Sequence, residues 1–315
     1  MTTTAPTTGI HHVTAIASDP QRNLDFYAGT LGLRLVKRTV NFDDPATYHF
    51  YYGDRTGRPG TLLTFFPWVG ARQGRDGIGQ AVRTAFAVPA GALDYWQERL
   101  TKAGLTGLAA REHFGERTLR FADPDGLGLE LVEDRDAHHS PVTLHEAVPE
   151  AAAIRRIHSN LLQLRGTDAT AALLTDVLGL VPSGTEHNVQ RFRPATGAGG
   201  GVDLSSETAG GAGVMGAGTV HHIAWRAADG EHQARLRGEL LGLGLQVTPV
   251  VDRQYFRSIY FREPGGVLFE IATDDPGFLI DESEATLGEE LRLPAQYESQ
   301  RVRIEAMLPG ILVPS

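Results

Sequence analysis

Cysteine is absent from this 315-residue chain. Disulfide bonds and thiolate metal sites are therefore excluded, and any bound metal ion has to be held by His, Asp or Glu. The chain also lacks a run of about 20 apolar residues, the length that a membrane-spanning helix requires. The opening segment MTTTAPTTG has neither a basic region nor an apolar core, so we expect no secretory signal and a cytoplasmic location.

Clustered positive charge is also absent. Lys and Arg number 29 against 38 Asp and Glu, which gives a net charge of -9. A nucleic-acid partner is therefore not expected, because binding to a phosphate backbone requires a basic surface. The hydrophobic content of 41% predicts instead a soluble globular protein with enough apolar side chains for two sizeable cores.

A fourfold repeat organises the sequence. Four segments have a strand pattern, an amphipathic helix and then a glycine, which is the residue that commonly ends a helix in the left-handed conformation: Gly32, Gly104, Gly179 and Gly242. Each segment continues through further strand patterns to a turn and a last strand. The repeat predicts an α+β fold of four βαβββ modules, with open mixed sheets that form a metal-holding cleft.

The chain order of the modules predicts two domains. Modules one and two would form an N-terminal domain over residues 1–140, and modules three and four a C-terminal domain over 150–279. The stretch DAHHSPVTLHEAVPE (136–150) has the composition of a linker between them. We expect residues 280–315 to form a helical tail that docks on the core or on a second subunit.

The repeat also provides a register that is independent of any functional residue. Counting 20 residues back from the four glycines, and aligning the turns before the last strands, marks two sets of equivalent positions: His12, Thr84, Ser159 and His222, and Phe65, Glu130, Ser205 and Glu270. Neighbouring modules in the chain would gather at most two good metal ligands. If modules one and four pair instead, two histidines and a carboxylate meet, with Phe65 in the fourth place.

Two histidines and one carboxylate form the facial triad of non-haem Fe(II) oxygenases, in which substrate and O₂ share the open coordination positions. An apolar Phe65 in the fourth place would keep the metal open. Zn and Mn also accept this donor set, so the ligands alone do not identify the metal. Glu130 lies in the ligand register without histidine partners, and we interpret it as a buried, hydrogen-bonded residue of a degenerate second copy.

Three long motifs resemble the hydroquinone ring-cleaving dioxygenases of the vicinal oxygen chelate (glyoxalase, bleomycin resistance and extradiol dioxygenase) superfamily. They are GIHHVTAIASDPQRNLDFYAGTLGLRLVKRTVNFDDPATYHFYYGD (9–54), TVHHIAWRAAD (219–229) and VVDRQYFRSIYFREPGGVLFEIATDDPGF (250–278). The similarity extends over nearly the whole chain and includes LPAQYESQRVRIEAMLPG (293–310). The resemblance implies the vicinal oxygen chelate fold and extradiol-type opening of a hydroquinone ring, with a small aromatic substrate and both atoms of O₂ incorporated.

The same resemblance implies site residues. It assigns Fe(II) to the three residues that the repeat selects, His12, His222 and Glu270, and a second sphere to His11, Thr14, His221, Arg253 and Tyr260. As a hypothesis, His11, His221 or Tyr260 handles protons of the substrate hydroxyl. Arg253 would stabilise anionic species or anchor a carboxylate of the iron shell.

Other interpretations stay open on the residues alone. Arg253 and Tyr260 also fit a salt bridge or the edge of a core, and Thr14 an ordinary strand position. We expect surface or structural roles for the remaining histidines, among them His49, His138 and His139. The glycine-rich VGARQGRDGIGQ (69–80) predicts a mobile loop, which we place over the mouth of the site.

Two further functions compete with a dioxygenase. One is an O₂-independent glyoxalase-type lyase or thiol transferase of the same superfamily that uses Zn, Ni or Mn. The other is a drug-binding module that needs no metal. Assembly into a homo-oligomer is compatible with the sequence, which does not specify the number of copies.

Overall fold

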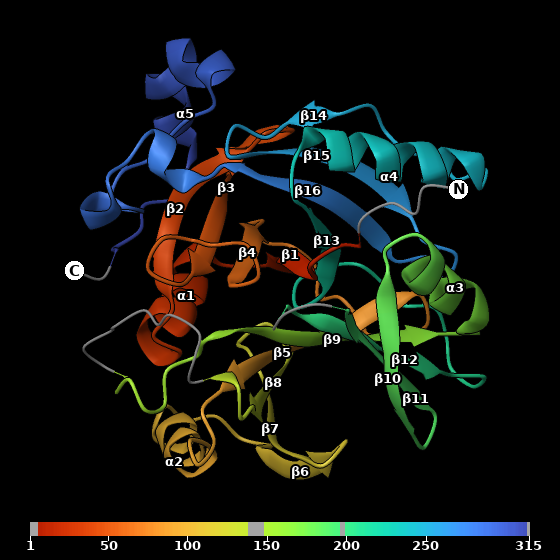
Figure 1. Cartoon of the computed structure of the whole chain (residues 1–315). Coiled ribbons are helices and arrows are strands. Elements are labelled where there is room, and N and C mark those ends of the chain that lie inside the picture. The colour runs from red at the N-terminus through yellow and green to blue at the C-terminus, as the bar shows by residue number, and fades with distance from the viewer. Residues whose placement is uncertain (1–5, 138–147, 196–198, 314–315) are drawn as a thin grey trace.

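The computed structural model describes residues 6–137, 148–195 and 199–313, and two eight-stranded sheets dominate it (Figure 1). His138 and His139 and most of the expected linker lie outside the described residues. The first sheet contains β1 (Ile10–Ala17), β2 (Arg34–Asn41), β3 (Asp44–Gly53), β4 (Leu62–Pro67), β13 (Val220–Ala227), β14 (Val251–Asp252), β15 (Phe256–Arg262) and β16 (Leu268–Pro276). The second contains β5 (Gln80–Val88), β6 (Ala109–His113), β7 (Glu116–Ala122), β8 (Gly128–Glu133), β9 (Arg156–Leu164), β10 (Leu180–Glu186), β11 (Val189–Pro194) and β12 (Gly201–Ser206).

Strand order shows which modules share a sheet. The first sheet runs β14-β15-β16-β13-β1-β4-β3-β2, so module four lies beside module one. The second runs β10-β11-β12-β9-β5-β8-β7-β6, which joins module three to module two. The predicted α+β class and the pairing of modules one and four are confirmed, and each sheet combines one module from each half of the chain. The domain boundaries taken from chain order stay a prediction.

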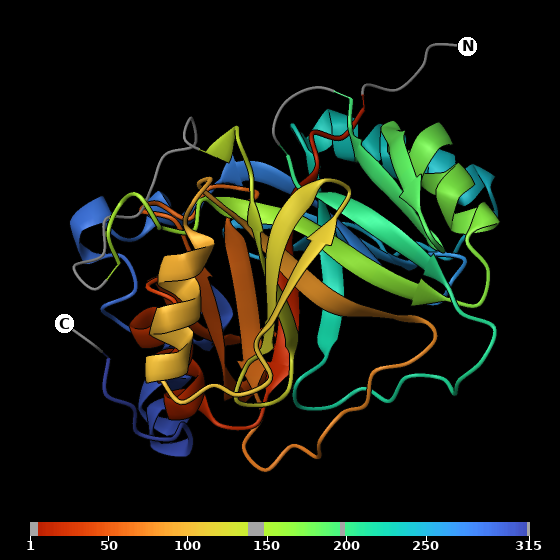
Figure 2. The same ribbon diagram turned by 90° about the horizontal axis from the view of Figure 1, so that it is seen from below.

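The helices connect the first two strands of each module. They are α1 (Pro20–Leu24) with its π-helical continuation η1 (Asp25–Thr30), α2 (Leu93–Lys102), α3 (Asp168–Asp176) and α4 (Gly230–Gly242). Asp19 caps α1 by accepting a hydrogen bond from the backbone of Arg22, as the sequence Asp-Pro predicts. Figures 1 and 2 show these helices on the outside of the sheets.

Three of the four predicted stop glycines have the left-handed conformation, with φ of 67° at Gly32, 82° at Gly104 and 69° at Gly179. The fourth prediction is wrong by two residues. Gly242 is the last residue of α4, and Gly244 adopts φ of 79° instead. Helix α4 is therefore longer than the repeat count assumes.

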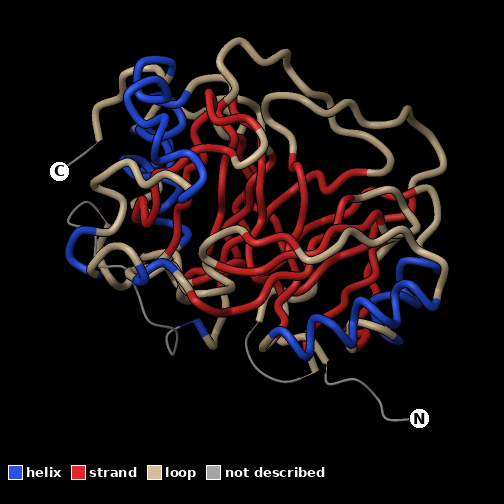
Figure 3. The backbone as a smooth tube through the Cα atoms, turned by 90° about the horizontal axis from the view of Figure 1, so that it is seen from above, coloured by secondary structure: helices blue, strands red, loops and turns tan. Residues whose placement is uncertain are grey.

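Two glycine-rich loops connect the sheets and run side by side (Figures 2 and 3). The loop predicted over 69–80 forms isolated bridges to residues 211–218, among them Arg75 to Val214 and Ile78 to Ala212. The backbones approach so closely that a Cβ atom at Gly77 would lie 2.6 Å from the backbone nitrogen of Gly213. Packing thus requires glycine at position 77.

The C-terminal tail packs against module one. It contains η3 (Phe278–Ile280), η4 (Glu284–Thr286), η5 (Ala295–Gln300) and α5 (Arg301–Met307), so it is less helical than predicted. Ile304 of α5 is buried in the core, and the Tyr297 hydroxyl donates a 2.7 Å hydrogen bond to the carbonyl of Phe42. The sequence allows the tail to dock on the core or on a second subunit, and in the structure the tail docks on the core. Among the described residues, no helix is long and apolar enough to cross a membrane.

Candidate metal centre

Three side chains from three adjacent strands converge inside the first sheet. The Glu270 Oε2 atom on β16 lies 2.9 Å from His222 Nε2 on β13 and 3.4 Å from His12 Nε2 on β1. The two Nε2 atoms are 3.4 Å apart, and one ligand atom from each residue lies within 4.8 Å of the others. All three residues are buried. The repeat therefore selected residues that the fold brings together.

Strand pairing explains this convergence. Strands β1 and β13 are antiparallel, with His12 opposite Ala224 and Thr14 opposite His222, so the two histidines occupy symmetric places on one face. In β16, Glu270 pairs with the same Ala224. A carboxylate and two imidazoles thus project from neighbouring backbone positions into the same space.

The neighbouring histidines hold the two imidazoles in orientation. His11 Nδ1 lies 2.9 Å from His12 Nδ1, and His221 Nδ1 lies 2.8 Å from His222 Nδ1. These contacts occupy the Nδ1 atoms of His12 and His222, so the Nε2 atoms of the two rings are directed at Glu270. Partners of this kind fix the ring orientation of metal-binding histidines.

The protonation states also fit a metal site. Burial lowers the pKa of His222, which favours the neutral imidazole that binds metals. Burial alone would raise the pKa of Glu270, but His12 and His222 together hold that pKa well below its usual range. Glu270 Oε1 accepts a hydrogen bond from Ser258, whereas Oε2 faces the two imidazoles. A buried, ionised oxygen and two imidazole nitrogens facing one point fit a divalent cation.

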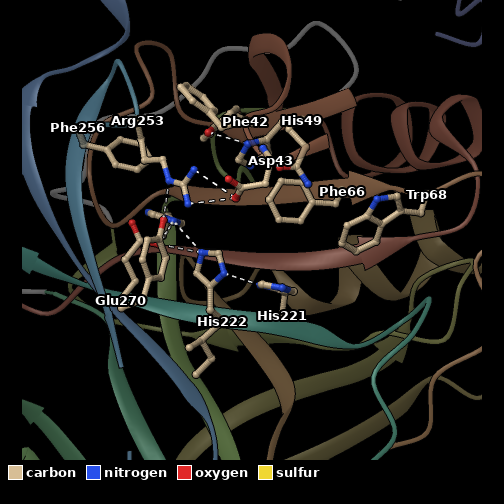
Figure 4. A pocket seen from close by; sticks show the side chains of 15 residues that line it. Phe42, Asp43, His49, Phe66, Trp68, His221, His222, Arg253, Phe256 and Glu270 are labelled. Atoms are coloured by element: carbon tan, nitrogen blue, oxygen red, sulfur yellow. Dashed lines mark hydrogen bonds and ion pairs between the residues drawn. The ribbon is translucent and has the colours of Figure 1, made fainter. Parts of the chain in front are cut away.

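A cavity of about 360 Å³ opens from these three residues. Aromatic side chains form much of its wall: Phe42, Phe66, Trp68, Phe256 and Tyr260. Figure 4 shows Arg253 and Glu270 on one side, with Phe66 and Trp68 on the other. A pocket of this size with a few polar groups suits a small aromatic molecule.

The five predicted second-sphere residues lie close to the triad. His221, Arg253 and Tyr260 line the cavity. His11 packs against Phe256, with ring centroids 5.1 Å apart, and is not part of the cavity wall. Thr14 faces Thr64, and their hydroxyl oxygens are 2.8 Å apart. Burial lowers the pKa of His221 to about 3, so its imidazole is neutral.

Arg253 lies between two aromatic rings at the entrance. Its guanidinium carbon is 5.6 Å from the ring centre of Phe42 and 5.3 Å from that of Tyr260. Its Nε atom donates a 3.0 Å hydrogen bond to the Tyr260 hydroxyl, and its terminal nitrogens lie 3.4 Å from the carboxylate of Asp43. The cationic group thus faces the cavity from the turn between β14 and β15.

The prediction for the fourth position is wrong by one residue. Phe65 points into the core behind the sheet, where its ring lies 4.4 Å from that of Tyr27. Thr64 pairs with Thr14, two residues after His12, just as Glu270 pairs with the residue two after His222. Because successive strand residues face opposite sides, this slip moves the side chain to the other face. The fourth place belongs to Thr64, whose hydroxyl bonds to Thr14 and His49.

The second sheet contains the degenerate copy. Strand pairing places Arg83 and Ser159 where the first sheet has its two histidines, and Glu130 and Asp203 where it has Thr64 and Glu270. The predictions of Thr84 and Ser205 for two of these places are therefore wrong. Glu130 is buried between Arg83 Nε at 3.1 Å and Arg120 Nε at 2.7 Å. Its predicted burial and hydrogen bonding are confirmed.

His49, Tyr51 and Asn41 line the cavity although the sequence analysis gave them no role there. His49 was expected to be structural or at the surface. The motif YHFYY in β3 contains the signal that was missed, because residues 49 and 51 share a strand face. Only the pairing of β3 with β4 shows that this face is the one that carries the cleft.

Comparison with known proteins agrees with this arrangement. Residues 9–131 match the model of the Glyoxalase/Bleomycin resistance protein/Dioxygenase superfamily. The chain is 51% identical over 304 residues, 96% of both chains, to MhqO of Bacillus subtilis, which is named as a candidate ring-cleaving dioxygenase. It is 38% identical over 302 residues, 92% of both, to the chlorohydroquinone/hydroquinone 1,2-dioxygenase of Sphingobium indicum.

Solved structures show the same fold. A crystal structure of a candidate dioxygenase from Bacillus subtilis superposes with a TM-score of 0.94 at 49% identity, covering 98% of this chain and 99% of the other. Glyoxalase I from Zea mays gives 0.61 at 14% identity, covering 84% and 92%. The latter similarity concerns the fold alone.

Proposed function

The chain belongs to the ring-cleaving dioxygenases of the Glyoxalase/Bleomycin resistance protein/Dioxygenase superfamily, and we propose that it opens hydroquinone rings in an extradiol-type reaction that depends on Fe(II). The observation that carries the proposal is the convergence of His12, His222 and Glu270 at one end of an aromatic-walled cavity. Two imidazoles and one carboxylate leave coordination positions for a substrate oxygen and O₂, which is the chemistry that Fe(II) supplies in such a triad.

The chain's own residues would bind and orient the ring. Phe66, Trp68 and Phe256 offer apolar surface to an aromatic substrate. Arg253, held between Phe42 and Tyr260, places positive charge beside the oxygen of a deprotonated phenol. Because the ligand atoms are fixed by His11 and His221, little reorganisation is needed when the substrate enters.

Proton handling falls to the residues that reach the cavity. His221 and Tyr260 line it, whereas His11 does not. Burial keeps His221 neutral, so its imidazole can form a hydrogen bond that orients the substrate hydroxyl. Tyr260, whose pKa is raised by burial, keeps its own proton and can donate a hydrogen bond.

An O₂-independent lyase would make different demands. A four-ligand metal site requires a donor in the place that Thr64 occupies, and the Thr64 hydroxyl is engaged by Thr14 and His49. This place therefore favours a three-ligand site with open positions.

The test is oxygen consumption by the protein after anaerobic loading with Fe(II), with hydroquinone and catechol as substrates and absorbance to follow ring-opened product. We expect uptake with hydroquinone. His12→Ala and Glu270→Ala should lose both bound iron and uptake, whereas His187→Ala, at an exposed position, should keep both. Bound iron with no uptake on either substrate would contradict the proposal.

A further inference from the structure

Hydroquinone and catechol present their second oxygen to different parts of a cavity. The hydroxyls of catechol are adjacent, so both can face one metal ion. Those of hydroquinone lie at opposite ends of the ring, so the second points away from the metal centre. A hydroquinone site therefore needs a buried polar group on the opposite wall, because an unpaired buried hydroxyl is costly.

A row of side chains crosses the first sheet from the metal centre to such a wall. In the strand ladders His222 pairs with Thr14, Thr14 with Thr64, and Thr64 with Tyr51. Paired residues share a face of the sheet, so the whole row lies on the side of the cavity. Three strand spacings, about 14 Å along the sheet, separate its ends. Tyr51 ends the row and lines the cavity.

Hydrogen bonds connect the last three members of this row through His49. The Thr14 and Thr64 hydroxyl oxygens are 2.8 Å apart, and Thr64 Oγ1 is 3.0 Å from His49 Nε2. The Tyr51 hydroxyl is 2.9 Å from His49 Nδ1. The His49 ring lies between those of Tyr51 and Phe66, with centroids 4.0 and 4.4 Å away. Burial lowers the pKa of His49, so the ring is neutral.

The number of protons leaves one donor free. Three hydroxyls and a neutral imidazole carry four polar hydrogens, and three hydrogen bonds use three of them. When His49 carries its proton on Nδ1, it donates to Tyr51, and the Tyr51 hydroxyl hydrogen is free. When the proton is on Nε2, Tyr51 donates to His49 and can only accept another bond. Tyr51 can therefore either donate to or accept from a ligand hydroxyl.

Two other polar side chains of the cavity wall, Tyr260 and Asn41, have partners of their own. Tyr260 packs on His222, with ring centroids 5.8 Å apart, and accepts from Arg253 near the metal centre. Asn41 Oδ1 accepts a 2.9 Å bond from the backbone of Asp43. Burial raises the pKa of Tyr51, so its hydroxyl keeps its proton. On the basis of the function proposed above, we propose that Tyr51, positioned by His49, binds the hydroxyl of hydroquinone that lies para to the metal-facing oxygen.

The experiment compares the binding of hydroquinone and of phenol, which lacks the second hydroxyl, to the Fe(II)-loaded enzyme without oxygen, by calorimetry. Tyr51→Phe should weaken hydroquinone binding about fivefold to tenfold, the value of one net hydrogen bond, and leave phenol binding unchanged. Tyr52→Phe is the matched control, because its hydroxyl bonds to Asn23 on the opposite face of β3. His49→Asn, which keeps an amide near Tyr51, should retain more of the preference for hydroquinone than His49→Ala.

The outcomes separate this inference from the function on which it rests. If the unmodified enzyme neither binds hydroquinone more tightly than phenol nor cleaves it, the proposed function fails. If it cleaves hydroquinone but Tyr51→Phe leaves the ratio of the two affinities unchanged, the role of Tyr51 alone is overturned. Thermal unfolding checks that each variant is folded. Should Tyr51→Phe not fold, the same ratio measured for His49→Ala decides: an unchanged ratio overturns the inference.

Discussion

Arg83 occupies in the second sheet the place that His12 occupies in the first. His12 lies two residues before Thr14, which pairs with Thr64, and Arg83 lies two residues before Ala85, which pairs with Glu130. Arg83 and Arg120 surround Glu130 with positive charge. Two guanidinium groups thus provide the counter-charge that a cation would supply beside Glu270. In the second sheet, ion pairs therefore fill the place that corresponds to the metal centre of the first.

Arg83→Ala should destabilise the protein by about 2 kcal/mol, because it leaves a buried carboxylate with one partner in place of two. The measurement is unfolding in denaturant. Lys102→Ala removes an exposed ion pair with Glu98 and should leave the stability almost unchanged. Metal content should be unaffected by Arg83→Ala. A loss of bound iron in a Glu130→Gln variant would show that Glu130 belongs to a second metal site.

His221→Ala should weaken metal binding about tenfold to a hundredfold, since the Nδ1 contact that orients His222 is lost. A competition titration with a metal-binding dye measures the affinity. His187→Ala is the control, because that side chain is exposed. Equal affinities for both variants would mean that the ring of His222 is oriented by its own strand.

The metal triad could be predicted from the sequence because it rests on a repeated motif. The pairs His11-His12 and His221-His222 mark the strand register directly, so an error in the helix count did not matter. The count itself was off by two residues at Gly242 and misplaced Thr84 by one residue, and the alignment of the turns misplaced Phe65 by one residue. Bulges and helix lengths shift such counts, and one residue in a strand exchanges the core face for the cleft face.

The rest of the cavity wall depends on contacts between distant strands. No local pattern distinguishes His49 of β3 from a structural histidine until β3 is placed beside β4, and β4 beside β1.

The structure of the C-terminal tail also depends on contacts with a distant strand. Its sequence from 286 to 308 has helical periodicity, but residue 291 instead forms a bridge to Arg38 of β2, so the helix starts later. Tertiary pairing outweighs local propensity in both places.

The stability of the protein should fall as the pH rises from about 4 to about 6 through one buried group. Burial raises the pKa of Asp123 to about 6, above its ordinary value of 3.8. For an acid whose pKa is raised on folding, the contribution to stability is complete below the unfolded pKa and is lost as the pH passes the folded pKa. The difference corresponds to about 3 kcal/mol as an upper value.

Asp123→Asn tests this pH dependence. The amide oxygen can still accept from the backbone amides of Asp125 and Leu127, as Asp123 Oδ1 does at 2.8 Å. The variant should therefore gain stability relative to the unmodified protein between pH 4 and pH 7, followed by urea unfolding at each pH. A stability difference that stays constant over this range would contradict the raised pKa.

The C-terminal tail is fastened to module one by a buried charge. Lys37 is fully buried in β2, donates to Asp281 at 2.6 Å and contacts Glu282 directly. The same tail places Phe278 against Tyr51, with ring centroids 5.1 Å apart, so the anchor supports the wall of the cavity.

Lys37→Met should therefore cost about 3 to 5 kcal/mol, because the buried carboxylate of Glu282 loses its nearest cation. The double variant Lys37→Met with Glu282→Gln should recover most of this loss, since no uncompensated charge then remains in the core. Denaturant unfolding of both single variants and the double variant gives the coupling energy. Additive losses would mean that Lys37 stabilises the fold through contacts other than its pair with Glu282, among them the Tyr255 ring, whose centre lies 4.8 Å from its amine.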